Sequence, residues 1–438
     1  MQFPACGLCF GTFHGIAHRL LRSHWKDAGL PENFQVLDSD DQLRLIKRVM
    51  RENQIDESKW PPKQAQWFIN SQKDEGLRAD HIQENPGDQF LTIMLKIYRQ
   101  YEKLCQQGGL VDFGELLLRS HELWLHRPEL LAHYQGRFQH ILVDEFQDTN
   151  TIQYAWLQVL ASTRVPLTVV GDDDQSIYGW RGAKIENIQQ YQRDFPNSRL
   201  VRLEQNYRST QMILKAANAV IANNQGRLGK ELWTDGPEGE PISLYAAFNE
   251  QDEANYIADS ISAWVQDGNL RSECAILYRS NAQSRVLEEA LMRQGIPYRV
   301  YGGLRFYDRQ EIRNALAYLR LVQYRRDDAA FERVVNVPPR GIGAKSLAEL
   351  REYATEQSIS LWESAERLLA AGQVKGRAKT GLQSFIAIIE KLSGMVGDAT
   401  LHGLMKQTIE DSGLKDYHAS EKGEKGQARV ENLSPISS

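Results

Sequence analysis

The amino-acid sequence predicts an α/β protein with two sheet-containing units and two mainly helical segments. Short apolar runs of strand length alternate with amphipathic helical patterns between residues 139 and 301. The stretches 14–138 and 302–438 are mainly helical in character. A chain of 438 residues is also too long for one ordinary core, so we expect several domains.

Five apolar runs are the expected strands. They are Ile141–Val143, Leu167–Val170 and Leu200–Leu203 in the first unit, then Ile242–Tyr245 and Ala275–Tyr278 in the second. The first two end at an acidic residue or at Gly-Asp, which is typical of buried parallel strands with functional side chains at their carboxyl ends. Amphipathic patterns predict the helices that separate these runs.

Composition and charge limit the classes of function. A net charge of −5 and a pI near 6.1 argue against a protein that holds nucleic acid by bulk positive charge. Cys6 and Cys9 have C-x-x-C spacing, but no second Cys or His pair follows at a matching spacing, so we expect ordinary thiols. No run approaches the ~18 apolar residues of a membrane span, and no signal peptide pattern opens the chain. We therefore expect a cytoplasmic protein with no membrane partner.

The first motif that carries chemistry is the acid pair Asp144-Glu145 at the end of an expected strand. One carboxylate can hold Mg²⁺ through its water shell, and the other can orient or deprotonate an attacking water. The alternative is a strand end that simply meets solvent.

The second motif runs from Val170 to Gly182 and combines acids, an amide, aromatics and an arginine. An acidic turn and Gln175 suit a nucleotide phosphate and its water. Tyr178, Trp180 and Arg181 offer flat faces and charge to unstacked bases. The alternative is that both aromatics belong to the core.

Three shorter segments are further candidates. Gly11–Gly15 presents Thr12, Phe13 and His14 in a glycine-bounded loop that suits phosphate and base contacts. Tyr207-Arg208 lies at the junction of the two expected sheet units, where an arginine can neutralise charge on a transferred phosphoryl group. Arg340-Gly341-Ile342-Gly343 lets backbone N–H groups approach a phosphate, although a plain tight turn is equally consistent with it.

Together these segments resemble the UvrD/Rep helicases, a branch of superfamily 1. Asp144–Asn150 closely resembles their Walker B signature, Val170–Gly182 resembles their coupling motif, and the likeness runs almost continuously from about Phe10 to Leu433. The resemblance implies an α/β fold with two RecA-like P-loop NTPase motor domains, both incomplete, and two mainly helical accessory insertions.

The resemblance also assigns a role to each candidate residue. It implies ATP and Mg²⁺ as cofactors, with catalytic roles for Asp144, Glu145, Gln175 and Arg208, and with Asp144 holding Mg²⁺ through water. Gln175 would sense the γ-phosphate, Arg208 would be an arginine finger, and Tyr207 would pack on the adenine. The implied DNA contacts are Thr12, Phe13, His14, Tyr178, Trp180 and Arg181 for single strands, and Arg340, Gly341 and Gly343 for the duplex.

Domain boundaries follow from the same resemblance. We expect residues 1–13 to be a remnant of the first motor domain, 14–138 its helical accessory domain, and 139–204 the first motor domain itself. Residues 205–301 would form part of the second motor domain, and 302–438 a truncated helical accessory domain.

Two parts of the family pattern are not found in the sequence. The phosphate-binding loop G-x-x-x-x-G-K-[ST] does not occur, and neither do the later motifs of the second motor domain. We therefore expect a chain truncated at both ends, whose own ATP hydrolysis is doubtful because the loop supplies most contacts to the β- and γ-phosphates.

Two functions remain open from the sequence. The first is an ATP-dependent 3′ to 5′ DNA helicase of UvrD type that acts in DNA repair, with single-stranded DNA, junctions of single-stranded and duplex DNA, and repair proteins as expected partners. The alternative is a catalytically inactive remnant that binds single-stranded DNA. Oligomeric state is left open.

Overall fold

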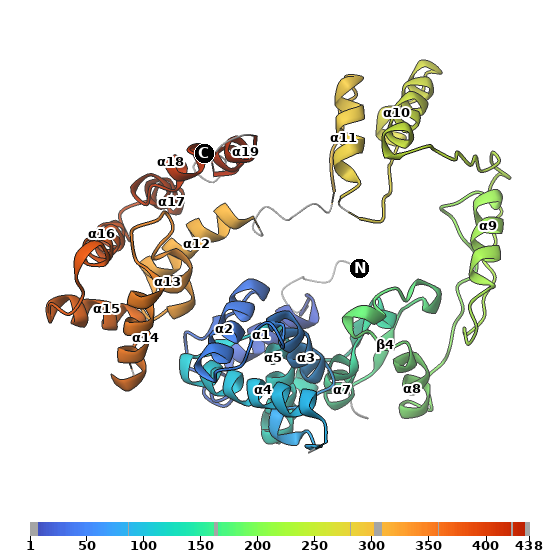
Figure 1. Ribbon diagram of the computed structural model, residues 1–438. Helices are drawn as coiled ribbons and strands as arrows, with labels where there is room; N and C mark the ends of the chain where they lie inside the picture. The colour runs from blue at the N-terminus through green and yellow to red at the C-terminus, as the bar shows by residue number, and fades with distance from the viewer. Residues whose placement is uncertain are drawn as a thin grey trace. The chain divides into compact units, whose positions relative to one another are not determined.

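The chain folds into two compact units, unit 1 from Met1 to Glu238 and unit 2 from Gly239 to Ser438. The computed structural model describes residues 8–85, 87–161, 165–280, 282–301, 309–357, 359–421 and 424–433 (Figure 1). Cys6 and most of the predicted remnant 1–13 lie outside the described residues, as does the start of the predicted segment 302–438.

Unit 1 begins with helices and one small parallel ladder, and then continues with alternating strands and helices. Its helical first part contains α1 (Phe13–Ser23), β1 (Gln35–Val36), α2 (Ser39–Glu52), α3 (Pro62–Asp74), α4 (Gln89–Gly108), β2 (Leu110–Val111), α5 (Phe113–His126) and α6 (Pro128–Arg137). Its second part contains β3 (Ile141–Val143), α7 (Thr151–Ala161), β4 (Leu167–Val169), α8 (Glu186–Asp194) and α9 (Gln211–Ile221). Short 3₁₀ turns cover Ala79–His81, Phe146–Asp148, Asp173–Gln175 and Gly179–Arg181.

Aspartates begin the helices that carry the helical part of unit 1. The Asp88 side chain accepts a hydrogen bond from the backbone N–H of Leu91 at the start of α4, and Asp112 does the same for Glu115 at the start of α5. α4 ends at Gly109, whose φ of +60° is a left-handed conformation that favours glycine. These caps fix where α4 and α5 lie along the chain, and therefore which charged side chains they bring together.

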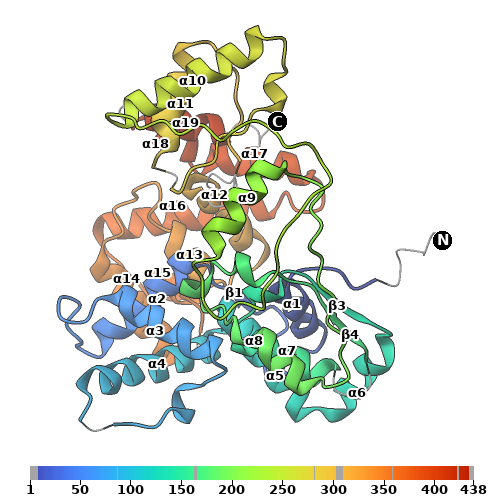
Figure 2. The same ribbon diagram turned by 90° about the vertical axis from the view of Figure 1, so that its right-hand side faces the viewer.

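Each strand pair in the described residues is parallel. β1 pairs with β2, and β3 pairs with β4 in the register Ile141 to Leu167 and Val143 to Val169. β3 and β4 lie side by side near α7 and α8 (Figure 2). One core joins these strands to α1, α5 and α7, with Leu117, Trp124 and Phe146 among its buried side chains.

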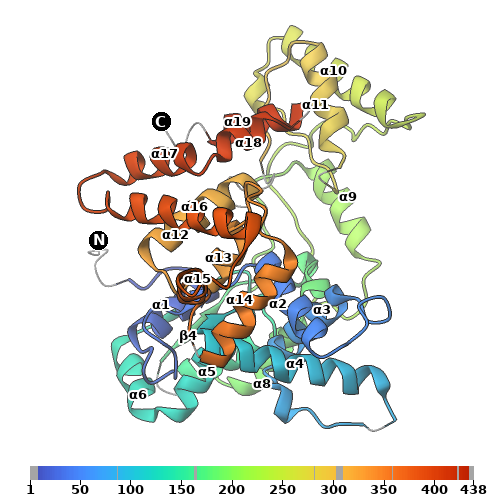
Figure 3. The ribbon, with the colours of Figure 1, turned by 60° about the vertical axis from the view of Figure 1, so that its left-hand side comes forward.

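The regular elements of unit 2, within its described residues, are all helices. Its elements are α10 (Glu250–Gln266), a 3₁₀ turn (Arg271–Glu273), α11 (Ser284–Arg293), α12 (Gln310–Gln323), α13 (Asp328–Val334), α14 (Ala344–Gln357), α15 (Leu361–Ala370), α16 (Gly376–Ser393), α17 (Leu401–Asp411), α18 (Leu414–Ala419) and α19 (Glu424–Leu433). α12 packs against α16 and α17 (Figure 3). The core of these later helices buries Tyr318, Phe331 and Phe385, whereas α10 and α11 share a small separate core.

Two of the five predicted strands are confirmed and three are wrong. Ile141–Val143 and Leu167–Val169 form β3 and β4. Leu200–Leu203, Ile242–Tyr245 and Ala275–Tyr278 have no regular secondary structure and form no strand. Most of their apolar side chains face solvent, with Leu203 79% exposed, Leu244 97% and Leu277 94%. A strand exists only through hydrogen bonds to a neighbour, and these runs have none, so the second predicted sheet does not form.

No helix in the described part of the chain is both long and apolar enough to cross a membrane.

Candidate functional site

The carboxyl ends of β3 and β4 bring the two main predicted motifs to one edge. β3 runs directly into Asp144-Glu145, and β4 runs into Gly171-Asp172. The N–H of Val170 donates to the carbonyl of Val143 at 2.8 Å, and the N–H of Phe146 donates to the carbonyl of Val170 at 2.9 Å. Because parallel strands end at the same side of a sheet, the acid pair and the acidic turn start out as neighbours.

Gln147 joins these two motifs, and sequence reasoning gave it no role. Its buried side chain donates from Nε2 to Oε2 of Glu145 at 2.7 Å, and its Oε1 accepts the N–H of Asp172 at 2.9 Å. A Cβ on Gly171 would lie 2.7 Å from this Oε1. Two features of the sequence could have indicated this role of Gln147: it is an amide within an acidic motif, and Gly171 follows the second strand.

The backbone of Glu145 is held in a left-handed conformation. Its φ is +51°, and only Gln54 shares a positive φ among the non-glycine residues that the structure describes. Such a conformation costs about 1–3 kcal/mol and is typical of functional sites, where the surrounding structure enforces it. Here the hydrogen bond from Gln147 fixes the side chain that the strained backbone directs.

Carboxylates are concentrated at the end of β3. Asp144 and Glu145 are exposed, and neither forms an ion pair within the described ranges. Burial raises the pKa of Asp148, and the nearby charge of Glu145 raises it further. Exposed, unneutralised carboxylate oxygens are the hard donors that Mg²⁺ prefers, so this end of β3 fits the predicted magnesium role.

Gln175 is tied to the acidic turn that precedes it. Its Nε2 donates to Oδ2 of Asp172 at 2.8 Å. Burial alone would raise the pKa of Asp172, but Lys230 and Gln175 outweigh that effect and hold the pKa below its usual value. Glu145, Gln147, Asp172 and Gln175 thus form one continuous hydrogen-bonded chain.

The carboxylates of the acidic turn Asp172–Asp174 lie within 4.8 Å of one another, close enough to share a cation. However, Asp172 and Asp174 already pair with Lys230 and Arg227, so internal cations neutralise the turn.

Tyr178, Trp180 and Arg181 form an exposed aromatic and cationic cluster. The two ring centroids are 6.5 Å apart, and Cζ of Arg181 lies 5.1 Å from the tyrosine ring centroid and 4.6 Å from that of Trp180. Trp180 is 68% exposed and Tyr178 is 36% exposed, so these side chains do not belong to the core. Exposed rings with an adjacent guanidinium suit stacking on unpaired bases.

Tyr207 and Arg208 lie outside this chain of hydrogen bonds. Tyr207 is 86% exposed and donates its hydroxyl to Oε1 of Gln205 at 2.7 Å. The backbone N–H of Arg208 donates to Oδ1 of Asn206 at 2.9 Å. Within the described ranges the Arg208 guanidinium has no hydrogen bond or ion pair with Glu145 or Gln175, so their convergence stays a prediction.

The segment Thr12–His14 makes contacts within the fold that the sequence did not indicate. Thr12 caps α1 and accepts the N–H of Gly15 at 3.2 Å. Phe13 packs edge to face on Trp156, with 6.4 Å between centroids, and His14 packs in the same way on Phe113. Burial lowers the pKa of His14, which favours the neutral imidazole. Only Thr12 is fully exposed, so a DNA contact of this segment stays a prediction.

The arginine of the turn Arg340–Gly343 points inward. The Arg340 guanidinium donates to the carbonyls of Pro338 at 3.2 Å and Ser412 at 3.1 Å, and lies over the rings of Tyr318 and Phe385. Gly341 and Gly343 are exposed, and the φ of Gly341 is +74°. The exposed glycine backbone is therefore what this turn offers to a phosphate.

Gly381 of α16 allows this turn to approach the helix. An added Cβ there would lie 2.2 Å from the backbone carbonyl oxygen of Arg340. We expect Gly381→Ala to lower the free energy of unfolding of unit 2 by ~1–3 kcal/mol, because a backbone clash cannot be relieved by a rotamer change. Urea denaturation measures this effect. Gly136→Ala in α6 is the control, because its Cβ meets open space and alanine favours a helix; equal stability of both variants would contradict the clash.

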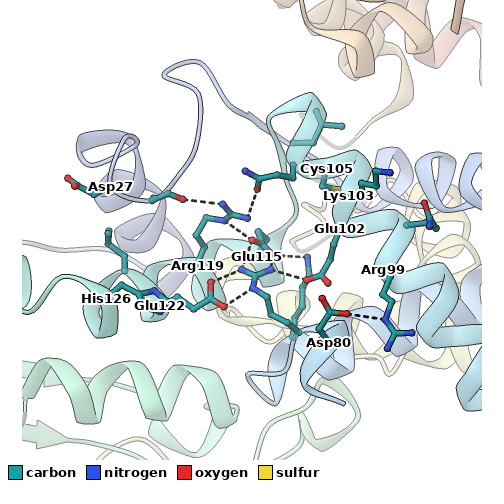
Figure 4. A pocket seen from close by; sticks show the side chains of 17 residues that line it. Asp27, Asp80, Arg99, Glu102, Lys103, Cys105, Glu115, Arg119, Glu122 and His126 are labelled. Carbon is teal, nitrogen blue, oxygen red and sulfur yellow. Dashed lines mark hydrogen bonds and ion pairs between the residues drawn. The ribbon is translucent and has the colours of Figure 1, made fainter. Parts of the chain in front are cut away.

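A charged cavity lies away from these motifs, among α3, α4 and α5. It measures about 600 Å³, and Figure 4 shows its charged lining. Arg78 donates to Glu102, Glu115 and Glu122 at 2.6–3.1 Å, and Lys73 contacts Asp112 at 2.7 Å. Because these charges are paired with one another, the lining is a structural network.

Comparison with known proteins identifies the class. Residues 4–196 match the UvrD/REP helicase N-terminal domain, and residues 201–369 match the UvrD-like helicase C-terminal domain. The chain belongs to the UvrD/Rep helicase family, whose two domains imply a two-domain superfamily 1 motor fold.

Particular relatives are DNA helicases. DNA helicase II of Escherichia coli strain K12 is 57% identical over 432 residues, which cover 98% of this chain and 60% of that protein. DNA helicase II of Haemophilus influenzae is 54% identical over 99% of this chain and 60% of its own length. ATP-dependent DNA helicase PcrA of Bacillus subtilis is 40% identical over 96% of this chain and 57% of its own length. The chain therefore spans about 60% of the length of these curated relatives.

Proposed function

We propose that this chain forms part of an ATP-dependent DNA helicase of UvrD type that moves 3′ to 5′ along single-stranded DNA and acts in DNA repair. The observation that carries the proposal is the hydrogen-bonded chain from Glu145 through Gln147 and Asp172 to Gln175. Tyr178 and Trp180 follow Gln175 on the same loop. A movement of Gln175 on nucleotide binding would therefore also move the side chains that stack on DNA.

Each residue contributes a separate step of this function. Asp144 would hold Mg²⁺ through water, Glu145 would orient the attacking water, and Gln175 would contact the γ-phosphate. Bound Mg²⁺ neutralises charge that develops on the phosphate oxygens. Arg208 would act as the arginine finger after domain closure, and Tyr207 would pack on the adenine. Exposure of both side chains supports their availability to a ligand.

The helical parts would serve DNA binding around the motor. We propose that residues 14–138 and 302–438 are accessory insertions, and that residues 139–204 and 205–301 contribute to the two motor domains. The exposed glycines of the Arg340–Gly343 turn would contact duplex phosphates at a junction. ATP hydrolysis by this chain alone is expected to be undetectable, because the sequence contains no G-x-x-x-x-G-K-[ST] loop.

Single-strand binding tests this function in the chain as it stands. We expect the wild-type chain to bind a fluorescein-labelled (dT)16 oligonucleotide, and Trp180→Ala to weaken binding by ~1–3 kcal/mol, or about 5- to 150-fold in Kd. Fluorescence anisotropy measures both. Trp67→Ala removes another exposed tryptophan and serves as the control. Unchanged affinity of the Trp180 variant with an intact fold would remove the stacking role.

A further inference from the structure

The acidic turn Asp172–Asp174 is gripped by a basic segment that lies more than fifty residues further along the chain. Arg227 donates to both oxygens of Asp174, from Nε at 2.7 Å and from a terminal nitrogen at 2.6 Å. The N–H of Leu228 donates to Asp173 at 2.7 Å, and Lys230 forms an ion pair with Asp172. Each carboxylate of the turn therefore has a partner in Arg227–Lys230.

These ion pairs are less exposed than an ordinary surface pair. The side chains of Arg227 and Asp174 are 18% and 14% exposed, and those of Lys230 and Asp172 are 17% and 23% exposed. A bidentate contact between a guanidinium and a carboxylate fixes the relative orientation of the two side chains. Exposed ion pairs with a single contact contribute little to stability. By contrast, Lys215 and Glu238 are 65% and 73% exposed and lie 3.8 Å apart.

The same basic segment is hydrogen bonded at its other end to the residues before Arg208. The N–H of Trp233 donates to the carbonyl of Glu204 at 3.1 Å, and the N–H of Asn206 donates to the carbonyl of Trp233 at 2.7 Å. Oδ1 of Asn206 in turn accepts the N–H of Arg208 at 2.9 Å. One segment thus contacts both the acidic turn of Gln175 and the loop of Arg208, although these two side chains do not contact each other.

We propose that residues 227–233, which we name the latch segment, are a positioning element that ties the acidic turn of Gln175 to the loop that carries Tyr207 and Arg208. The contact joins residues of the region matched by the N-terminal helicase domain with residues of the region matched by the C-terminal one. This inference rests on the proposed function, because Gln175 and Arg208 take their roles from it.

The latch segment and simple electrostatics predict opposite changes in DNA affinity when a carboxylate of the acidic turn is removed. Asp172 holds Gln175, and Tyr178 follows three residues later, so release of the turn displaces the aromatic cluster. Asp174→Asn removes a negative charge, which by itself would strengthen binding to a polyanion. The latch predicts the opposite sign, namely weaker binding.

The test uses the full chain and two measurements. We expect Asp174→Asn and Arg227→Gln each to weaken (dT)16 binding ~5-fold or more, with Arg227→Lys intermediate because it keeps the charge and loses the fork. The exchanged pair Asp174→Arg with Arg227→Asp should recover most of the affinity. Glu238→Gln, the control with the same change of charge, should bind (dT)16 at least as tightly as the wild type does.

Amide hydrogen exchange separates the latch from the proposed function. In Asp174→Asn we expect faster exchange both in residues 171–182 and in residues 204–209, with Glu238→Gln unchanged. Unchanged exchange in 204–209 would overturn the latch, and so would stronger (dT)16 binding by Asp174→Asn. If the wild-type chain fails to bind (dT)16, the proposed function is overturned, and the exchange measurement still decides whether the latch exists.

Discussion

Lys73→Met is expected to lower the free energy of unfolding of unit 1 by ~3–5 kcal/mol, as removal of one partner from a buried ion pair does. Lys73 is 1% exposed, and its ammonium lies 2.7 Å from Asp112 and 3.0 Å from Glu115. Methionine has a similar volume, so the substitution removes the charge and leaves little cavity. The cost arises because two buried carboxylates lose a shared cation.

The surrounding ion pairs show which of the two carboxylates loses more of its stabilisation in Lys73→Met. Burial alone would raise the pKa of Glu115, but Lys73, Arg78 and Arg119 outweigh it and hold that pKa well below its usual range. Glu115 therefore keeps two arginines in the variant. Among the residues that the structure describes, Asp112 keeps only the hydroxyl of Tyr101 at 2.7 Å, a long contact from Gln42 and the backbone N–H that it caps.

Urea denaturation of the full chain measures this effect. Arg99→Met is the control, because Arg99 pairs with Asp80 and Glu84 at the surface of the same unit and should cost less than ~1 kcal/mol. A Lys73 variant as stable as this control would show that the network contributes little to the fold.

The sequence predicted the parts of the site that local pattern determines. β3 and β4 were recognisable because a short apolar run ends at acidic residues, and parallel pairing then brings Glu145 and Asp172 to one edge. The exposure of Tyr178 and Trp180 also agrees with their predicted role. The three other apolar runs are equally short and apolar, but a strand also needs a neighbour, and sequence periodicity carries no information about that neighbour.

Contacts between distant residues were not predictable in this way. Arg340 was expected on a DNA surface, yet its guanidinium reaches the carbonyl of Ser412, which belongs to another part of the helical fold. Lys73 and Asp112 look like ordinary surface charges in the sequence, and only the packing of α3 against α5 buries them together. The ion pair between Arg227 and Asp174 likewise depends on tertiary structure alone.

Glu145→Gln is expected to have the largest effect on catalysis. Glutamine keeps the size of the side chain and its hydrogen bond to Gln147, but it can no longer accept a proton from the attacking water. Loss of a general base reduces turnover by ~10²- to 10⁴-fold. Nucleotide binding should persist, because the phosphates are held by other groups.

ATP hydrolysis in a protein that joins this chain to an upstream G-x-x-x-x-G-K-[ST] loop tests the catalytic role of the acid pair most directly. We predict phosphate release that (dT)16 stimulates, and its loss in Glu145→Gln at unchanged nucleotide affinity. Stimulated hydrolysis that continues at the wild-type rate in the Glu145 variant would contradict the assignment of the acid pair at the end of β3 as the catalytic centre.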